Sequence, residues 1–169
     1  MANQVEKFGF RPVRKLDGSP FINAQNKYRI ASNYGTAIFQ GDLVVPVTDG
    51  TVPTTQKPTW KNYYPGSVVA SDITAFVLDD PDIVGKMDCD GAFAVADIFK
   101  DFNVTNVSGN TQSGISEVQL DFSASGLTIA FMLQAIDISQ NPDNDEAGAA
   151  NVNVLVRINN HFYRLNTGL

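Results

Sequence analysis

The chain is poor in the residue types that build reaction centres. It contains one cysteine, Cys89, and one histidine, His161. A single cysteine excludes an intrachain disulfide. A zinc site needs three or four nitrogen or sulfur ligands, and a Ser-His-Asp or Cys-His arrangement would have to use His161. The motif G-x-S-x-G is absent. We therefore expect a buried Cys89, a hydrogen-bonded structural His161 and no enzymatic activity.

Long apolar runs and a general excess of positive charge are also missing. The longest apolar run, from Leu127 to Leu133, is interrupted by Thr128 and is shorter than the ~20 residues of a membrane helix. No secretory signal is evident, so we expect a soluble protein with no membrane partner. The net charge of −6 disfavours nucleic acid as the main partner, because phosphate binding needs a broad basic face. No nucleotide-binding loop is present, and no cofactor is expected.

The positive charge that the chain does have is concentrated at its N-terminal end. Residues 1–30 hold six of the twelve Lys and Arg residues with two acids, whereas the other 139 residues hold six bases against sixteen acids. Pro12 and Pro20 favour extended backbone in the basic part. The pattern predicts an extended N-terminal attachment arm over residues 1–26 and a single β-rich domain over residues 27–169.

The rest of the composition is typical of a small β protein. Hydrophobic residues make up 43% of 169 residues, enough for one domain with a core. Asn, Thr, Ser and Gly are abundant, and turn-forming residues of this kind separate short strands. We expect a mainly β fold: a small antiparallel β-barrel or sandwich with an extended N-terminal arm and one or two short helices.

Alternating apolar residues locate the expected strands. A hairpin is predicted over residues 28–39, with its turn at 32–35, followed by an edge strand at 42–47. Residues 96–103 are expected to form a helical turn, and residues 116–122 a short helix capped by Ser116. Further strands are predicted at Ile73–Leu78, Ile83–Met87, near Ala92–Val95, from Leu127 onward and at Val152–Ile158.

Two segments supply the candidate contact residues. The predicted long loop over residues 48–67 carries Trp60, Tyr63 and Tyr64, and aromatic loops are common contact surfaces. Capping of the core edge by Trp60 is an equally good interpretation. The arm contributes cations and two phenylalanines. The complete set of partner-binding candidates is Phe8, Phe10, Arg11, Arg14, Lys15, Trp60, Tyr63 and Tyr64.

A run of acids in the middle of the chain allows three interpretations. Asp79, Asp80, Asp82, Asp88 and Asp90 fit solvated turn acids, oxygen ligands for Ca²⁺, or a carboxylate pair for glycoside hydrolysis. Residues 143–148 begin like an EF-hand loop but lack the later ligands. We adopt the first interpretation and predict no metal site.

Five segments of the chain are similar, in the same order, to segments of one protein family, and they are spread over most of the chain. They are Phe8–Arg14, Tyr34–Asp42, Asp79–Asp82, Asp90–Ile98 and Val156–His161. Together they resemble a family of small virion proteins of tailed bacteriophages, described as structural or head-decoration (cement) proteins. The resemblance implies a non-enzymatic protein that binds the major capsid protein on the outer surface of the head, after assembly in the host cytoplasm. It also favours a symmetric homo-oligomer, most simply a homotrimer. It assigns no role to any individual residue.

Three alternatives stay open beside this interpretation. The chain fits a tail or head–tail joining protein, or a carbohydrate-binding module of the virion that stacks sugars on Trp60, Tyr63 and Tyr64. A glycosidase that uses a pair of aspartates is the third. Copy number per virion distinguishes a lattice protein from a tail or portal protein.

Overall fold

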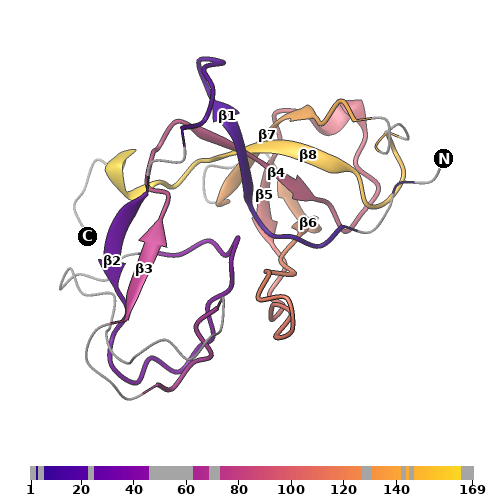
Figure 1. Cartoon of the computed structure of the whole chain (residues 1–169). Coiled ribbons are helices and arrows are strands. Elements are labelled where there is room, and N and C mark those ends of the chain that lie inside the picture. The colour runs from indigo at the N-terminus through magenta and orange to yellow at the C-terminus, as the bar shows by residue number, and fades with distance from the viewer. Residues whose placement is uncertain are drawn as a thin grey trace.

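The computed structural model describes residues 3, 6–22, 25–45, 63–68, 73–126, 131–141, 144 and 147–164. Within these residues the chain forms two antiparallel sheets and two short 3₁₀ helices (Figure 1). No helix of the described part is long and apolar enough to cross a membrane. The strands are β1 (Arg11–Lys15), β2 (Asn26–Arg29), β3 (Thr74–Val77), β4 (Ile83–Asp88), β5 (Asp101–Val104), β6 (Leu120–Gly126), β7 (Leu133–Ile138) and β8 (Asn153–Ile158), and the helices are η1 (Val95–Asp97) and η2 (Phe162–Arg164).

The larger sheet has the strand order β1-β4-β8-β7-β5-β6, and the smaller one pairs β2 with β3. β1 and β6 form the two edges of the larger sheet and do not pair with each other, so the described sheet is open and not a closed barrel. The small sheet lies beside one end of the large one (Figure 1). The prediction of a mainly β, antiparallel fold with one or two short helices is confirmed.

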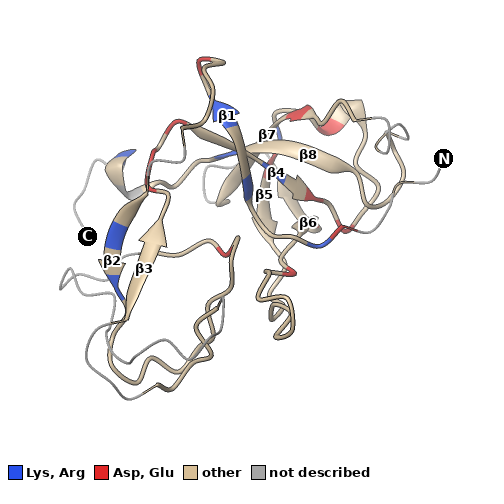
Figure 2. Ribbon diagram, viewed as in Figure 1, with Lys and Arg blue, Asp and Glu red and all other residues tan. Residues whose placement is uncertain are grey.

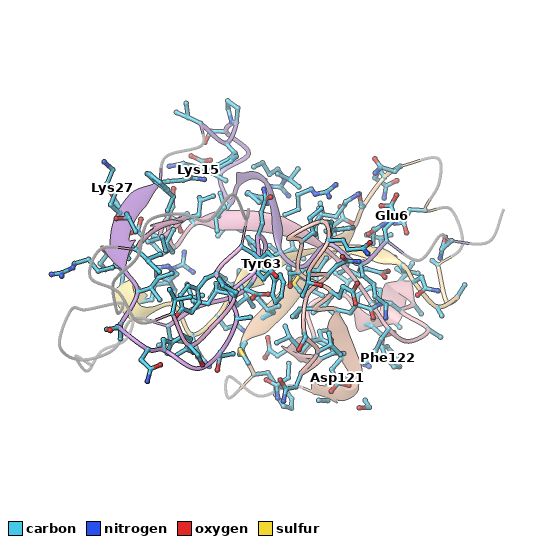
Figure 3. The ribbon with its side chains drawn as sticks, turned by 60° about the horizontal axis from the view of Figure 1, so that its bottom comes forward. Glu6, Lys15, Lys27, Tyr63, Asp121 and Phe122 are labelled. Carbon is cyan, nitrogen blue, oxygen red and sulfur yellow. The ribbon has the colours of Figure 1, made fainter. Side chains whose placement is uncertain are left out.

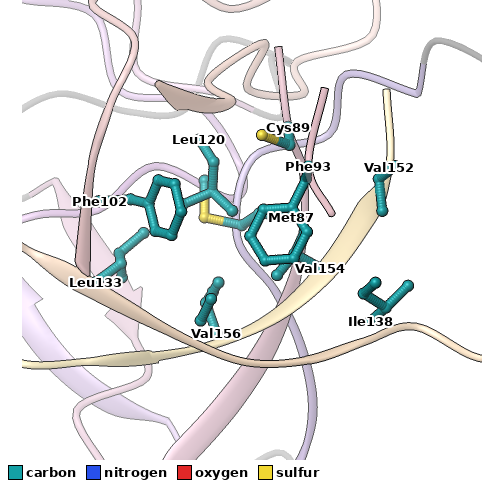
Figure 4. Packing of buried hydrophobic residues seen from close by; sticks show 11 residues of the cluster. Met87, Cys89, Phe93, Phe102, Leu120, Leu133, Ile138, Val152, Val154 and Val156 are labelled. Atoms are coloured by element: carbon teal, nitrogen blue, oxygen red, sulfur yellow. The ribbon is translucent and has the colours of Figure 1, made fainter. Parts of the chain in front are cut away.

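The core lies on one face of the large sheet, where β4, β8 and β7 supply alternate residues. Met87 opposes Val154, and Ala135 opposes Val156; all four are fully buried. Phe93 and Phe102 close over them with ring centroids 5.7 Å apart (Figure 4). Burial of this kind contributes about 1.5–3 kcal/mol for each large side chain. The cluster consists of Met87, Cys89, Phe93, Phe102, Leu120, Leu133, Ala135, Ile138, Val152, Val154 and Val156.

Several predicted strands are confirmed, and in β8 the apolar periodicity coincides with burial. β3, β4 and β8 lie within the predicted ranges or differ from them by one residue. Val152, Val154 and Val156 are buried as expected, and Ile158 packs against the same cluster while only half-buried. The strand expected from Leu127 is observed as β7 from Leu133; residues 127–130 lie outside the described part.

The predicted hairpin over residues 28–39 is wrong. β2 pairs with β3, from Asn26 opposite Val77 to Arg29 opposite Thr74. A turn does follow β2, where the Tyr34 amide donates to the Ala31 carbonyl at 3.0 Å, but the chain beyond it pairs elsewhere. The amide and carbonyl of Ile38 bond to Tyr64. Both halves of the predicted hairpin therefore pair with segments that are distant in sequence and not with each other.

Three other local predictions are corrected by long-range contacts. Residues 116–119 do not form a helix: Gln119 bonds across to Thr105 through its backbone and to Asp88 through its side chain. The strand near residues 92–95 is replaced by the start of η1, where the Asp97 carboxylate accepts from the Ala94 amide at 2.9 Å. The predicted helical turn at 96–103 is limited to the end of η1, since Asp101 already begins β5. Residues 42–45 form no strand, and residues 46–47 are outside the described part.

The N-terminal segment is extended, as expected, and it is part of the large sheet. β1 pairs with β4 from Arg11 opposite Lys86 to Lys15 opposite Ile83. The Phe10 ring fills the space above Gly85, where an added Cβ would lie 2.4 Å from the ring. Residues 11–15 therefore belong to the body of the fold and do not form a separate arm.

Truncation of Phe8 tests this integration. Phe8 is 6% exposed, so Phe8→Ala is expected to lower the free energy of unfolding by about 3 kcal/mol through lost burial and the cavity left behind. Val13→Ala is the matched control, because Val13 is 47% exposed and surface changes cost about 0.5 kcal/mol or less. Urea unfolding measures both. Equal midpoints for Phe8→Ala and the wild type would show that the segment does not pack on the body.

Candidate functional site

Two phenylalanines of the N-terminal segment serve the fold and are not exposed contacts. Two cations stack on the Phe8 ring, with the Arg11 guanidinium carbon 4.4 Å and the Lys86 Nζ 5.0 Å from its centroid. Glu6 extends this stack through an ion pair with Lys86 at 3.8 Å. Phe10 packs against the core cluster. Phe8 and Phe10 were predicted partner contacts. The structure instead places Phe8 against Arg11 and Lys86, and Phe10 over Gly85 and against the core.

The outer edge of β1 is protected against further strand pairing. Pro12 has no amide proton, and the register shifts between Pro12 and Arg14, which leaves Val13 as a bulge. At one end the Phe10 amide bonds to the Gly41 carbonyl at 2.8 Å, and at the other the Lys15 amide bonds to the Ser19 carbonyl at 2.9 Å. These are the features that prevent edge-to-edge association. Among the described residues, the outer edge of β1 is therefore interrupted as a site for pairing with a further strand.

The basic candidates of β1 differ in availability. Arg11 is exposed beside Phe8. Arg14 is half-buried and donates to the Lys15 carbonyl at 3.1 Å. Lys15 forms an ion pair with Asp80 at 2.7 Å, and that hydrogen bond raises the pKa of Lys15. Of the three predicted cations on β1, Arg11 is the most exposed.

The small sheet carries a second basic surface that the sequence-based list missed. Lys27 and Arg29 of β2 are exposed and, two residues apart on a strand, they share one face; Figure 2 marks them blue on β2. They oppose Phe76 and Thr74 of β3. The Lys27 Nζ lies 5.8 Å from the centroid of the Phe76 ring, and Phe76 is 60% exposed. We call Lys27, Arg29, Thr74 and Phe76 the basic ribbon face. The sequence did contain a signal for this surface, because cations occupy positions 27 and 29, two residues apart. That signal could be used only if residues 26–29 were recognised as a strand with one face covered and the other exposed.

The aromatic candidates of the 48–67 segment are partly internal. Tyr64 is buried, and its hydroxyl donates to the Tyr34 carbonyl at 2.9 Å. Tyr63 is half-buried, with its ring stacked on Phe39 at 4.7 Å between centroids. Trp60 lies outside the described residues. A sugar-stacking platform needs open ring faces, so Tyr64 does not contribute to one in this conformation.

The turn between β3 and β4 joins the two sheets through its carboxylates. Asp79 accepts from Asn26 Nδ2 at 2.9 Å, from the Tyr28 hydroxyl at 2.6 Å and from the Tyr163 hydroxyl at 3.3 Å. Burial alone would raise the pKa of Asp79, but these hydrogen bonds outweigh it and hold the pKa below its ordinary value. Burial and the bond to Asp79 raise the pKa of Tyr28. Asp79 is therefore a buried, bonded carboxylate and not the solvated turn acid that was predicted.

The two acids that follow pair with the chain's own cations. Asp80 binds Lys15 at 2.7 Å, and this bond lowers the pKa of Asp80. Asp82 pairs with Arg164 of η2. The turn thus connects β1, β2 and the segment after β8. In Figure 3 Lys15 and Lys27 lie toward the same end of the molecule, and Glu6 lies toward the other.

The five aspartates are divided between the two ends of β4. β4 is six residues long, and a strand rises about 3.3 Å per residue, so Asp80 and Asp90 are farther apart than the roughly 5–9.5 Å that paired carboxylates of glycosidases require. No group of three or more His, Cys, Asp or Glu among the described residues is arranged to hold a metal ion. Asp90 accepts from the Phe122 amide at 2.9 Å. Residues 143, 145 and 146 of the EF-hand-like segment lie outside the described part.

The single histidine and the single cysteine occupy structural positions. His161 is 6% exposed just after β8, and its Nδ1 accepts from the Tyr163 amide at 3.3 Å. Burial is the main reason that the pKa of His161 lies below its ordinary value. Cys89 is fully buried in the core, and burial raises the pKa of its thiol to about 12. Both residues lie where a structural role predicts.

Comparison with known proteins gives no family assignment: no protein-family model matches the chain, and no curated protein or solved structure is significantly similar to it.

The Asp79 hydrogen bonds yield a prediction about pH dependence. Tyr28→Phe removes one donor to a charged acceptor and is expected to lower the free energy of unfolding by about 1.5–3 kcal/mol near neutral pH. Because the pKa of Asp79 is depressed, the stabilisation is present above its ordinary value of 3.8 and is lost as pH falls through the folded-state value.

Urea unfolding of wild type and Tyr28→Phe over a pH series measures this difference. It should be constant above pH 4 and decrease below it. Tyr34→Phe is the control, because Tyr34 is 42% exposed and loss of its hydroxyl is expected to change stability little. A Tyr28→Phe effect that does not diminish in acid would contradict the role of the carboxylate.

Proposed function

We propose that this chain is a non-enzymatic structural protein of a tailed-bacteriophage head. It binds the major capsid protein on the outer surface of the virion, spans the boundaries between capsid subunits and stabilises the shell against the pressure of packaged DNA. The proposal rests on the resemblance carried by the five segments above. In this proposal the protein is a homotrimer, because a trimer matches the three-fold positions of a capsid lattice.

The observation that supports this function best is the exposure of cations on regular strands of an otherwise acidic protein. Arg11, Lys27 and Arg29 are exposed on β1 and β2, where Figure 2 colours the basic residues blue. Asp79, Asp80 and Asp82 of the adjoining turn are bonded within the chain. Basic groups on rigid elements meet an acidic surface without a large loss of conformational entropy. They also guide the encounter electrostatically.

Stabilisation of a shell by such a protein follows from mass action. A protein that binds the assembled lattice and not its separated subunits favours assembly by RT ln(1 + [L]/Kd) at each site. No reaction centre is required for this effect. Weak contacts with the capsid are sufficient for tight binding when several copies bind together as a symmetric oligomer.

Copy number distinguishes this function from its alternative. Quantitative mass spectrometry of purified virions is expected to find the protein in numbers comparable with the major capsid protein. A number comparable with a portal or tail ring would favour the joining-protein alternative instead. Absence from purified particles would rule out both functions.

A charge-neutralising variant tests the contact surface. Lys27→Gln is expected to weaken binding to particles stripped of this protein by about twofold to fivefold at low salt, the range of an exposed ion pair. The loss should shrink as salt is raised, because screening weakens exposed pairs. Binding is measured by co-sedimentation over a concentration series.

Gln112→Glu is the matched control for this variant. It makes the same change in net charge on an exposed turn remote from β2 in sequence, so it should bind as the wild type does. Equal weakening by Lys27→Gln and Gln112→Glu would indicate an effect of net charge alone. Wild-type binding by Lys27→Gln would remove the basic ribbon face from the contact.

A further inference from the structure

Two buried oxygen atoms without partners belong to neighbouring strands of the large sheet. Asp88 of β4 is directly opposite Asn153 of β8, and the two residues are 1% and 6% exposed. The Oδ1 atom of Asp88 and the Oδ1 atom of Asn153 have no hydrogen-bond donor. Directly opposed residues of an antiparallel pair point to the same face, with Cβ atoms about 4.5–5.5 Å apart. The two unsatisfied oxygens are therefore on adjacent side chains.

The polar groups around this pair are already used. Gln119 Nε2 donates to the other carboxyl oxygen, Asp88 Oδ2, at 2.8 Å. The Asn144 side chain is bound to backbone: its Nδ2 donates to the carbonyls of Ser139 and Asn153, at 2.8 and 2.9 Å, and its Oδ1 accepts from the Asn153 amide at 2.7 Å. Neither neighbouring amide is directed at the two Oδ1 atoms.

One proton would satisfy both atoms. If Asp88 were ionised, its buried negative charge would lie beside the amide oxygen of Asn153, which is also an acceptor. Neither Oδ1 atom would then have a donor to replace the water lost on burial, and the folded state would be destabilised. A neutral carboxyl has one donor and one acceptor. We propose that Asp88 is protonated in the folded protein and that its Oδ1–H donates to Asn153 Oδ1, while Oδ2 accepts from Gln119. The β4–β8 pair is thus a proton-binding site inside the sheet.

The electrostatic surroundings are consistent with a neutral Asp88. Burial has the largest influence and raises the pKa of Asp88 to about 6, and the charge of Glu6 in the overlying N-terminal segment acts in the same direction. The hydrogen bonds from the Gln119 side chain and the Cys89 backbone, and the charge of Lys7, lower the pKa but do not outweigh burial. Lys86 shares the face of β4 with Asp88 but is engaged by Glu6. Asp137 of β7 lies on the same face, one residue pair farther along the sheet. No described cation is paired with Asp88.

The consequence is a stability that falls as pH rises. The folded-state pKa of Asp88, about 6, lies above its ordinary value of 3.8. Between these values the unfolded chain has released the proton and the folded chain still holds it. The contribution of Asp88 is therefore fully present below pH 4 and is lost as pH rises through 6. A difference of about two pKa units corresponds to a change of about 100-fold in the unfolding equilibrium constant.

Asp88→Asn imitates the protonated state and tests the proposal. An asparagine amide donates to Asn153 Oδ1 and its carbonyl accepts from Gln119, at every pH. The ratio of unfolding constants, wild type over Asp88→Asn, is therefore expected to rise by about 100-fold between pH 4 and pH 7.5. Asp137→Asn removes an acid from the same sheet face and should leave this pH profile as in the wild type. An Asp88→Asn profile parallel to that of the wild type would overturn the proposal.

A direct titration of the wild-type protein provides a second test that does not depend on any variant folding. The ¹³C shift of the Asp88 carboxyl carbon, followed by NMR, is expected to titrate with a midpoint near pH 6. A midpoint below about pH 4 would overturn the proposal, because it would show an ionised carboxylate that accepts from a rotated Asn153 amide. If Asp88→Asn does not fold, this titration decides alone.

Discussion

Pairing of β4 with β1 on one side and with β8 on the other holds the basic N-terminal segment and the C-terminal strand in one sheet. This strand is buried along almost its whole length. Gly85 at its centre leaves room for the Phe10 ring, and a side chain there would displace the segment. The acidic turn immediately precedes β4, and Asp88 of the proposed proton site is the last residue of β4. Both polar features therefore depend on the position of this one strand.

Distribution of charge follows from the same arrangement. The acids nearest to the small sheet are bonded to Lys15, Tyr28 and Arg164, each from a different part of the chain. They stabilise the junction between the sheets and leave the neighbouring cations of β2 exposed. A surface of this kind fits an acidic partner better than a phosphate backbone, because it is narrow and the protein as a whole has a net charge of −6. The proposed capsid contact uses this narrow basic region.

Sequence periodicity predicted the elements in which local pattern and burial agree. β8 was found because Val152, Val154 and Val156 alternate with residues of the other face. β4 is buried on both of its faces and was found as an apolar segment that follows the turn residues Asp79–Asp82. The hairpin after β2 and the helix at 116–122 failed because their partners, β3 and Asp88, are distant in sequence. Phe8 was assigned to a contact surface because a short pattern does not distinguish an exposed aromatic from one covered by Arg11 and Lys86. The surface formed by Lys27 and Arg29 could be recognised only once the pairing of β2 with β3 was known.

A reconstruction of the phage head by electron cryomicroscopy tests the central claim most directly, because it shows both the location and the orientation of the chain. The account predicts density for this fold on the outer surface of the capsid, at boundaries between subunits, with the basic ribbon face turned toward the capsid protein. Density only at the portal or tail would contradict it. A head-bound chain with Lys27 and Phe76 facing solvent would contradict the proposed contact surface.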